Sequence, residues 1–294
     1  MISQDSFNDL KNEVAIFLFS YNFEKSIEKS LDSILGQITS IPIKIYCIDD
    51  GSNDGTQKIL KKYSEKNKNI KLILSNTNTK LPLSLVFKSN IDFNSKYFCL
   101  LDGDDYWIDE CNLQKKINIL NNDKKIIGCS SITKMISKDD VALIKADKEL
   151  FNKTDMCAYG NIYSFYCHTS SLLWKNYYYN KKTKLPFPPH VGQKGLDGDT
   201  FLFHQMLNKN HQIYVIQEVL SIYNFNNKGA WSSLPKQARD EKNKILRKKI
   251  FNYSPFKYKI LYLLIIFSKF IIFKKNKIYK LFFKILRTKP VNFL

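Results

Sequence analysis

The sequence predicts an α/β fold with a mostly parallel, doubly wound sheet, and three observations support this prediction. Short apolar runs typical of strands alternate with segments of helical periodicity in the first half of the chain. Two of these runs end abruptly in carboxylates, at residues 49–50 and 102–105. The chain has 294 residues, of which 44% are hydrophobic, which suffices for one large core and an appendage. Open α/β sheets bind ligands at the carboxyl ends of their strands, so the acids mark the expected site.

Strands and helices are expected to alternate along the chain. The apolar runs expected as strands span residues 14–19, 43–48, 70–74, 97–101 and 213–222. The segments with apolar residues at helical spacing span residues 27–35, 59–63, 82–90 and 201–207. Gly36 is expected to end the first helix. This order is typical of parallel strands joined by crossover helices.

Residues 97–107 concentrate charge behind a buried strand. Asp102, Asp104 and Asp105 place three carboxylates within four positions. Carboxylates this close repel one another unless a cation lies among them. Mg²⁺ binds one or two carboxylates together with water and phosphate oxygens, so one interpretation is a metal site for a phosphorylated ligand. The other interpretation is an acidic turn that caps a helix starting near Ile108.

A second pair of acids, Asp49 and Asp50, follows the strand at residues 43–48. The polar residues at 51–56 suit the start of a helix, because Asp, Ser and Asn accept hydrogen bonds from its first amides. Capping alone does not require two adjacent acids at the end of a buried strand. We therefore expect a ligand-facing role for this pair.

Three motifs, in this order, resemble the GT-A glycosyltransferases of family 2. They are Ser20-Tyr21-Asn22 after the first strand, Asp49-Asp50-Gly51-Ser52 after the second, and Leu101-Asp102-Gly103-Asp104-Asp105 after the fourth. The resemblance covers roughly residues 14–235. It implies a GT-A fold and an inverting transferase with a nucleotide-diphosphate sugar donor, here a UDP-hexose or UDP-N-acetylhexosamine. The implied acceptor is a lipid-linked oligosaccharide or a cell-surface glycan.

The resemblance also assigns donor-site roles. The Ser20-Tyr21-Asn22 motif would line the nucleobase pocket, and Asp50 would hydrogen-bond the base. Asp102 and Gly103 would lie near the ribose.

The same resemblance implies a divalent metal, Mg²⁺ or Mn²⁺. Asp102 and Asp104 would form the metal-binding pair, with Asp105 as a further ligand. Which of Asp104 and Asp105 touches the metal directly stays open. The metal would stabilise the charge that develops on the departing diphosphate.

On the acceptor side, four residues are candidates. His168 would contact acceptor or phosphate, or else is a structural histidine with satisfied hydrogen bonds. Asp197 precedes a predicted helix, and Asp199 lies at its first turn. The resemblance assigns Asp199 the role of the general base that takes the proton of the acceptor hydroxyl; the alternative is a simple helix N-cap. Trp231 lies in a segment that resembles the closing loop of the family.

The chain departs from the family pattern in two places. Many relatives carry a glycine and an arginine after the third strand, whereas residues 75–82 have neither. The candidates for that donor-binding role are Lys80 and Lys88. Relatives often have Arg and His where Asn224 and Asn226 stand, which would shift binding of metal or diphosphate to a neighbour. The candidates for that task are Asn226, Lys228 and Trp231.

The positive charge is concentrated in the tail. Residues 236–294 hold 17 Lys and Arg against Asp240 and Glu241, a net of +15 in a chain of +19. We therefore divide the chain into a catalytic domain at 1–235, with a donor half at 14–120 and an acceptor half at 121–235, and a helical appendage at 236–294.

Two features of this tail suggest a membrane surface. The apolar run at 260–273 is shorter than the roughly 20 residues that span a bilayer. From 277 to 287, one helical face is basic and the other apolar, as in helices that lie in the membrane surface. The basic residues are Lys277, Lys280, Lys284 and Arg287. The alternative is a core helix with a solvated basic face.

Composition limits the remaining possibilities. Six cysteines without a C-x-x-C pair indicate reduced core residues. Residues 1–12 lack the basic start and apolar run of a signal peptide, so we expect a cytoplasmic protein, peripheral on the inner face of the plasma membrane. The alternatives are a nucleotidyltransferase, a basic tail that binds nucleic acid, which the aliphatic content of the tail disfavours, and a non-catalytic assembly factor on this fold.

Overall fold

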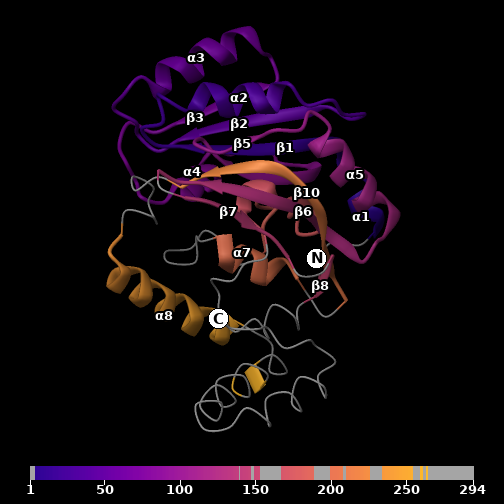
Figure 1. Ribbon diagram of the computed structural model, residues 1–294. Coiled ribbons are helices and arrows are strands. Elements are labelled where there is room, and N and C mark those ends of the chain that lie inside the picture. The colour runs from indigo at the N-terminus through magenta and orange to yellow at the C-terminus, as the bar shows by residue number, and fades with distance from the viewer. Residues whose placement is uncertain are drawn as a thin grey trace.

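The computed structural model of the chain describes residues 4–138, 140–146, 149–152, 167–188, 199–207, 210–225 and 234–253, with residues 259, 260 and 263. Within these residues the strands form one ten-stranded sheet. The order along it is β3-β2-β1-β4-β9-β6-β10-β5, with β7 paired to β6 and β8 to β10. Helices lie on both sides of this sheet (Figure 1). The predicted α/β fold class is confirmed.

The elements of the first half are α1 Gln4–Asn8, β1 Lys11–Ser20, α2 Ile27–Leu35, β2 Ile43–Asp49, α3 Thr56–Lys66, β3 Ile70–Leu74, α4 Pro82–Lys88, β4 Ser95–Asp102, β5 Tyr106–Trp107 and α5 Asn112–Asn122. Those that follow are β6 Ile126–Ile136, β7 Val141–Ile144, β8 Leu150–Asn152, the 3-10 turn η1 Thr169–Ser171, β9 Leu173–Lys175, α7 Asp199–Met206, β10 Gln212–Asn224 and α8 Lys236–Tyr253.

Strands β1 to β4 are parallel, so their carboxyl ends meet at one edge of the sheet. Ser20 pairs with Asp49 across β1 and β2, and Phe19 pairs with Asp102 across β1 and β4. Strand β9 runs antiparallel between β4 and β6, and β10 runs parallel to β6. The end of β10 at Asn224 therefore reaches the same edge as the acids.

The acidic stretch is not a helix cap. The sequence allowed a helix starting near Ile108, but α5 begins at Asn112. Strand β5 intervenes and pairs with β10, with Tyr106 opposite Ile222. The acids are thus separated from α5 by a strand, because Tyr106 and Trp107 extend along β10 before the chain turns.

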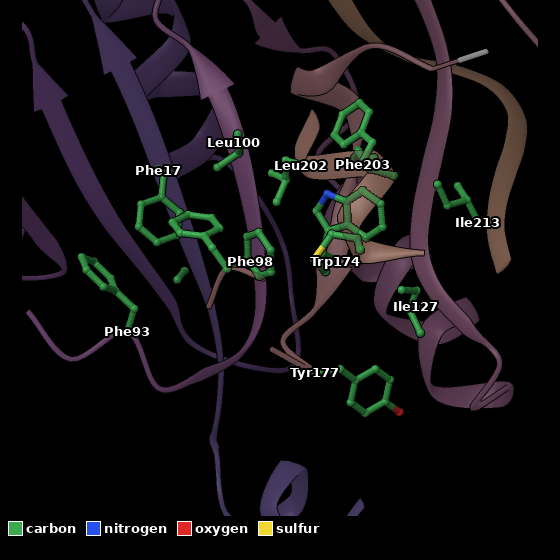
Figure 2. Packing of buried hydrophobic residues seen from close by; sticks show 14 of the residues in the cluster. Phe17, Phe93, Phe98, Leu100, Ile127, Trp174, Tyr177, Leu202, Phe203 and Ile213 are labelled. Carbon is green, nitrogen blue, oxygen red and sulfur yellow. The ribbon is translucent and has the colours of Figure 1, made fainter. Parts of the chain in front are cut away.

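Alternate side chains of the central strands supply two cores on opposite faces of the sheet. Val14, Ile16 and Leu18 of β1 pack with α2, α3 and α5. Ala15 and Phe17 face the other side, where α4 and α7 pack. Figure 2 shows this second core, with Phe17 and Phe98 on one side and Trp174 beside Phe203 of α7 on the other. Successive side chains of these strands point to opposite faces, and both faces are buried. The sequence therefore shows continuous apolar runs rather than an alternation of apolar and polar residues.

Helix α8 contacts α7 beyond this second core. It is basic, and Asn243 and Leu246 face inward, whereas Lys244, Ile245 and Lys248 are exposed. Within the part of the chain that the structure describes, no helix combines the length and the hydropathy needed to cross a bilayer.

Candidate active site

The polar residues at the strand ends are bound to one another. Asp49, at the end of β2, is fully buried. Its carboxylate accepts hydrogen bonds from the Ser20 hydroxyl (2.9 Å), the Ser52 backbone amide (2.9 Å) and hydroxyl (2.5 Å), and the side-chain Nε2 of Gln57 (2.7 Å). With this set of donors, Asp49 ties β1, the turn after β2 and α3 together. The ligand-facing role expected for the pair stays a prediction, and it concerns its neighbour Asp50.

Asp50 lies beside the loop after β3, in which the sequence singled out Lys80 but not Thr79. Its Oδ1 accepts two hydrogen bonds from Thr79, from the amide (2.9 Å) and the hydroxyl (2.6 Å). No donor to the other oxygen, Oδ2, is found in the described part of the chain. This arrangement fixes the orientation of the Asp50 carboxylate. Two features of the sequence pointed to this loop: it follows β3, the strand next to β2 in the sheet, and residues 75–82 depart from the family pattern.

Gly51 allows the close approach of this loop. It has a φ of +77°, and a Cβ there would lie 2.3 Å from the backbone carbon of Thr77. Only glycine accommodates both the left-handed conformation and the contact. Lys80 follows in the same loop with a φ of +58°, so the loop that holds Asp50 also carries one of the two candidate lysines.

Two donor-site candidates follow β1. Tyr21 is 40% exposed at the edge where the acids meet. Asn22 donates its amide to the Ser52 hydroxyl (2.8 Å), and its side-chain oxygen accepts from the Asn53 amide (2.9 Å). Asn22 thus joins the loops after β1 and β2 and holds Tyr21 at the surface.

The acid loop, residues 102–105, presents its carboxylates differently. Asp102 is exposed, Asp104 is 9% exposed, and Asp105 is fully buried. The loop is held to β1 by the Gly103 amide, which donates to the Phe19 carbonyl (2.7 Å). The structure brings Asp102 and Asp104 to the same strand ends as Asp50.

Asp105 is bound from both sides by protein groups. Its Oδ2 accepts from the Ser170 hydroxyl (2.5 Å), and its Oδ1 accepts from the Asn224 amide (3.1 Å). Burial, followed by the charges of Asp102 and Asp104, raises the pKa of the Asp105 carboxyl well above its usual range. The three acids therefore repel one another, and the innermost is engaged by protein donors.

His168 lies against this buried acid. Its Nδ1 is 3.4 Å from the Ser170 amide and 3.5 Å from Asp105 Oδ2. Its ring stacks on Tyr223, with centroids 4.1 Å apart and planes at 24°. The side chain is 16% exposed. These contacts hold η1 and β10 around Asp105, as a structural histidine would, and contact of His168 with acceptor or phosphate stays a prediction.

Asn224 is the residue whose role the sequence did not reveal. Its amide donates to Asp105, and its side-chain Nδ2 donates to the backbone carbonyl of Asp104. The sequence marked it only as a departure from the arginine of many relatives. A distance of 120 residues along the chain separates it from Asp104, so no local pattern could indicate the contact.

Part of the acceptor side falls on residues that are not described. Asp199 is the first residue of α7, as expected. Asp197, Asn226, Lys228 and Trp231 lie outside the described residues.

The comparisons with known proteins agree with this geometry. The model of Glycosyl transferase family 2 matches residues 15–180, more than half of the chain. The chain belongs to glycosyl transferase family 2. The matched region contains the motifs at Ser20, Asp50 and Asp102, so the resemblance read from the sequence is confirmed.

Two curated proteins are similar to part of this family 2 glycosyltransferase. An uncharacterized glycosyltransferase of Haemophilus influenzae is 30% identical over 138 residues, which are 45% of this chain and 40% of that protein. An uncharacterized protein of Mycobacterium tuberculosis is 30% identical over 128 residues, 43% of this chain and 36% of that protein. The matched stretches span well under half of these relatives.

Solved structures confirm the GT-A fold of this glycosyltransferase. TarS residues 1–349 of S. aureus, in complex with UDP-GlcNAc, has a TM-score of 0.55 at 16% identity, covering 86% of this chain and 79% of that one. The mannosyltransferase PcManGT of Pyrobaculum calidifontis, in complex with GDP-Man and Mn²⁺, has a TM-score of 0.54 at 15% identity, covering 83% and 64%.

Proposed function

We propose that this family 2 member transfers a sugar from a nucleotide-diphosphate donor, with inversion, to a glycan acceptor. The observation that carries the proposal is that Asp50, Asp102 and Asp104 meet at one sheet edge. The base would hydrogen-bond Asp50, and the ribose would lie near Asp102 and Gly103. UDP-GlcNAc, the ligand bound to TarS, is the first donor to test.

The acid loop fits a divalent metal ion. Among the described residues, no cluster of three or more His, Cys, Asp or Glu side chains could hold a metal by itself. Mg²⁺ and Mn²⁺ sites at diphosphates use one or two carboxylates and complete their coordination with water and phosphate oxygens. Asp102 and Asp104 would hold the ion. Asp105, bound by Ser170 and Asn224, would keep the acid loop in position. When bound, the metal would supply charge stabilisation to the departing diphosphate.

Asp199 is the proposed general base. Its place at the start of α7 puts it in the acceptor half of the chain, and an ionised carboxylate there would take the proton of the attacking hydroxyl. Inversion follows because the hydroxyl attacks the anomeric carbon from the face opposite the leaving diphosphate.

Calorimetry of donor binding tests the donor site. UDP should bind in the presence of Mn²⁺, and Asp104→Ala should abolish that metal dependence because one carboxylate of the pair is lost. Glu65→Ala on α3 is the control, since it removes an acid away from the acid loop. Absence of UDP binding under any metal condition would overturn the proposed function.

Turnover tests the base. Asp199→Asn keeps the side-chain shape and removes the proton acceptor, so we expect a loss of 10²-fold or more in kcat, on the order of the usual contribution of a general base. Donor affinity should stay within a factor of about two of the wild type, because the base acts on the acceptor. Unchanged turnover would remove Asp199 from the mechanism.

We also propose that the enzyme is peripheral on the inner face of the plasma membrane and meets a lipid-linked acceptor there. Basic residues suit the anionic lipids of that leaflet. The described part of the appendage already exposes both kinds of side chain, with Lys244 and Lys248 beside Ile245. Ile260 and Leu263, further along the appendage, are 43% and 55% exposed. The helix proposed for residues 277–287 lies outside the described residues.

A further inference from the structure

Strand β10 ends in a residue that touches the acid loop twice. Asn224 is the last residue of β10, and its backbone amide donates to Asp105 Oδ1 at 3.1 Å. Its side-chain Nδ2 donates to the carbonyl oxygen of Asp104. Asn224 thus binds both residues that follow Gly103, Asp104 at its backbone carbonyl and Asp105 at its carboxylate.

The strand that carries Asn224 is itself held firmly. Asn224 lies opposite Ile136 in the pairing of β10 with β6, and the next amide, that of Phe225, donates to the Ile136 carbonyl (2.8 Å). On its other side β10 pairs with β5, which directly follows the acid loop. Asn224 therefore forms a fixed point against which the backbone of Asp104 is positioned.

We propose that Asn224 is a positioning residue of the donor site. Its side-chain amide holds the Asp104 carbonyl, and this sets the direction in which the Asp104 carboxylate meets the divalent cation and the diphosphate. The inference rests on the proposed function. Asparagine suits the task because its NH₂ group donates, whereas an aspartate of the same size would present only acceptors to a carbonyl oxygen.

Mn²⁺ binding to the full chain, followed by the electron paramagnetic resonance of free Mn²⁺ at saturating UDP, tests the inference. Residues that orient metal ligands typically change metal affinity by about 10- to 100-fold when replaced. Asn224→Ala should therefore weaken Mn²⁺ binding by about tenfold or more. Asn224→Asp, which keeps the size but removes the donor, should weaken it as well.

Gln217→Ala is the matched control. Gln217 is an exposed amide on the same strand, and it donates to the carbonyl of Val215 on its own strand (2.9 Å). Its variant should bind Mn²⁺ as the wild type does. The thermal midpoints of the Asn224 variants should stay within a few degrees of the wild type, so that a loss of affinity is not a loss of fold.

Two outcomes separate the inference from the function on which it rests. Wild-type protein that binds Mn²⁺ and UDP, with Asn224 variants that bind them equally well, would overturn the positioning role alone. Wild-type protein that binds neither would overturn both.

Discussion

At the scale of single residues, the donor site depends on side chains that fix one another. Asp49 and Asp105 are both fully buried and both accept hydrogen bonds from several elements. Buried carboxylates are tolerated only with such partners, because an unpaired buried charge is costly. Their sequence neighbours Asp50 and Asp104 are held by further bonds, from Thr79 to the Asp50 carboxylate and from Asn224 to the Asp104 carbonyl.

Gly103 offers a test at this scale. A Cβ there would lie 2.7 Å from Ile27 Cδ1 and 3.0 Å from the Phe19 carbonyl oxygen, so Gly103→Ala must push the acid loop away from β1. Overpacking of this kind costs about 1–3 kcal/mol. Urea denaturation should show that loss, and UDP binding should weaken with it. Gly36→Ala, whose nearest contact is 3.2 Å, should be close to neutral; equal stabilities of the two variants would contradict the argument.

At the scale of elements, α5 places a lysine side chain, that of Lys116, in the core. Lys116 is 1% exposed, and its Nζ donates to the Ser171 carbonyl (2.5 Å), next to the serine that binds Asp105. Burial lowers the pKa of Lys116 to about 8, opposed by weaker attractions to Asp109 and to three thiols. These thiols belong to Cys99, Cys129 and Cys167, of which the first two have pKa values raised to about 12 by burial.

The pH dependence of stability tests this lysine. An unfolded lysine has a pKa of about 10.4, so between pH 8 and pH 10 the unfolded chain binds more protons than the folded chain at this site. The contribution of Lys116 to the free energy of unfolding therefore rises with pH in that window. The unfolding free energy of wild type minus that of Lys116→Met should increase by about 3 kcal/mol from pH 7 to above pH 10. Urea titrations at each pH measure it, and a difference independent of pH would contradict the lowered pKa.

At the scale of the whole molecule, the charge is divided between a nearly neutral catalytic part and a basic appendage. Residues 1–235 hold only +4 of the net +19. Both cores of the sheet lie in that part, and α8 joins it through α7. We propose that this division of charge suits a transferase whose acceptor lies in a membrane.

Vesicle binding tests the appendage. Each basic residue at an anionic surface contributes about 1 kcal/mol, so replacing Lys277, Lys280 and Lys284 by Gln should weaken binding to phosphatidylserine vesicles by roughly 100-fold. Raising the salt concentration should weaken wild-type binding in the same way. The control replaces three exposed lysines of α3 by Gln. Those lysines are Lys58, Lys61 and Lys62.

Equal losses in the tail and α3 variants would mean that the net charge, and not the tail, attracts the membrane. Absence of binding of the wild-type protein to anionic vesicles would contradict peripheral membrane binding altogether.

The sequence by itself determined the fold class, the family and the positions of the main acids. Strand and helix periodicities are local, and the carboxyl ends of parallel strands meet at one edge whatever the details of packing. The predicted runs at 43–48 and 70–74 match β2 and β3 closely for this reason.

Only the tertiary structure decided which partners each acid has and how deeply it is buried. Asp49 and Asp50 are adjacent in the sequence, yet Asp49 accepts hydrogen bonds from β1, the following turn and α3, whereas Asp50 accepts them from Thr79 in the loop after β3. Asp105 is engaged by Ser170 and Asn224, residues 65 and 119 positions away along the chain. Burial and partners set the role of a carboxylate, and both depend on elements that meet only when the sheet is complete.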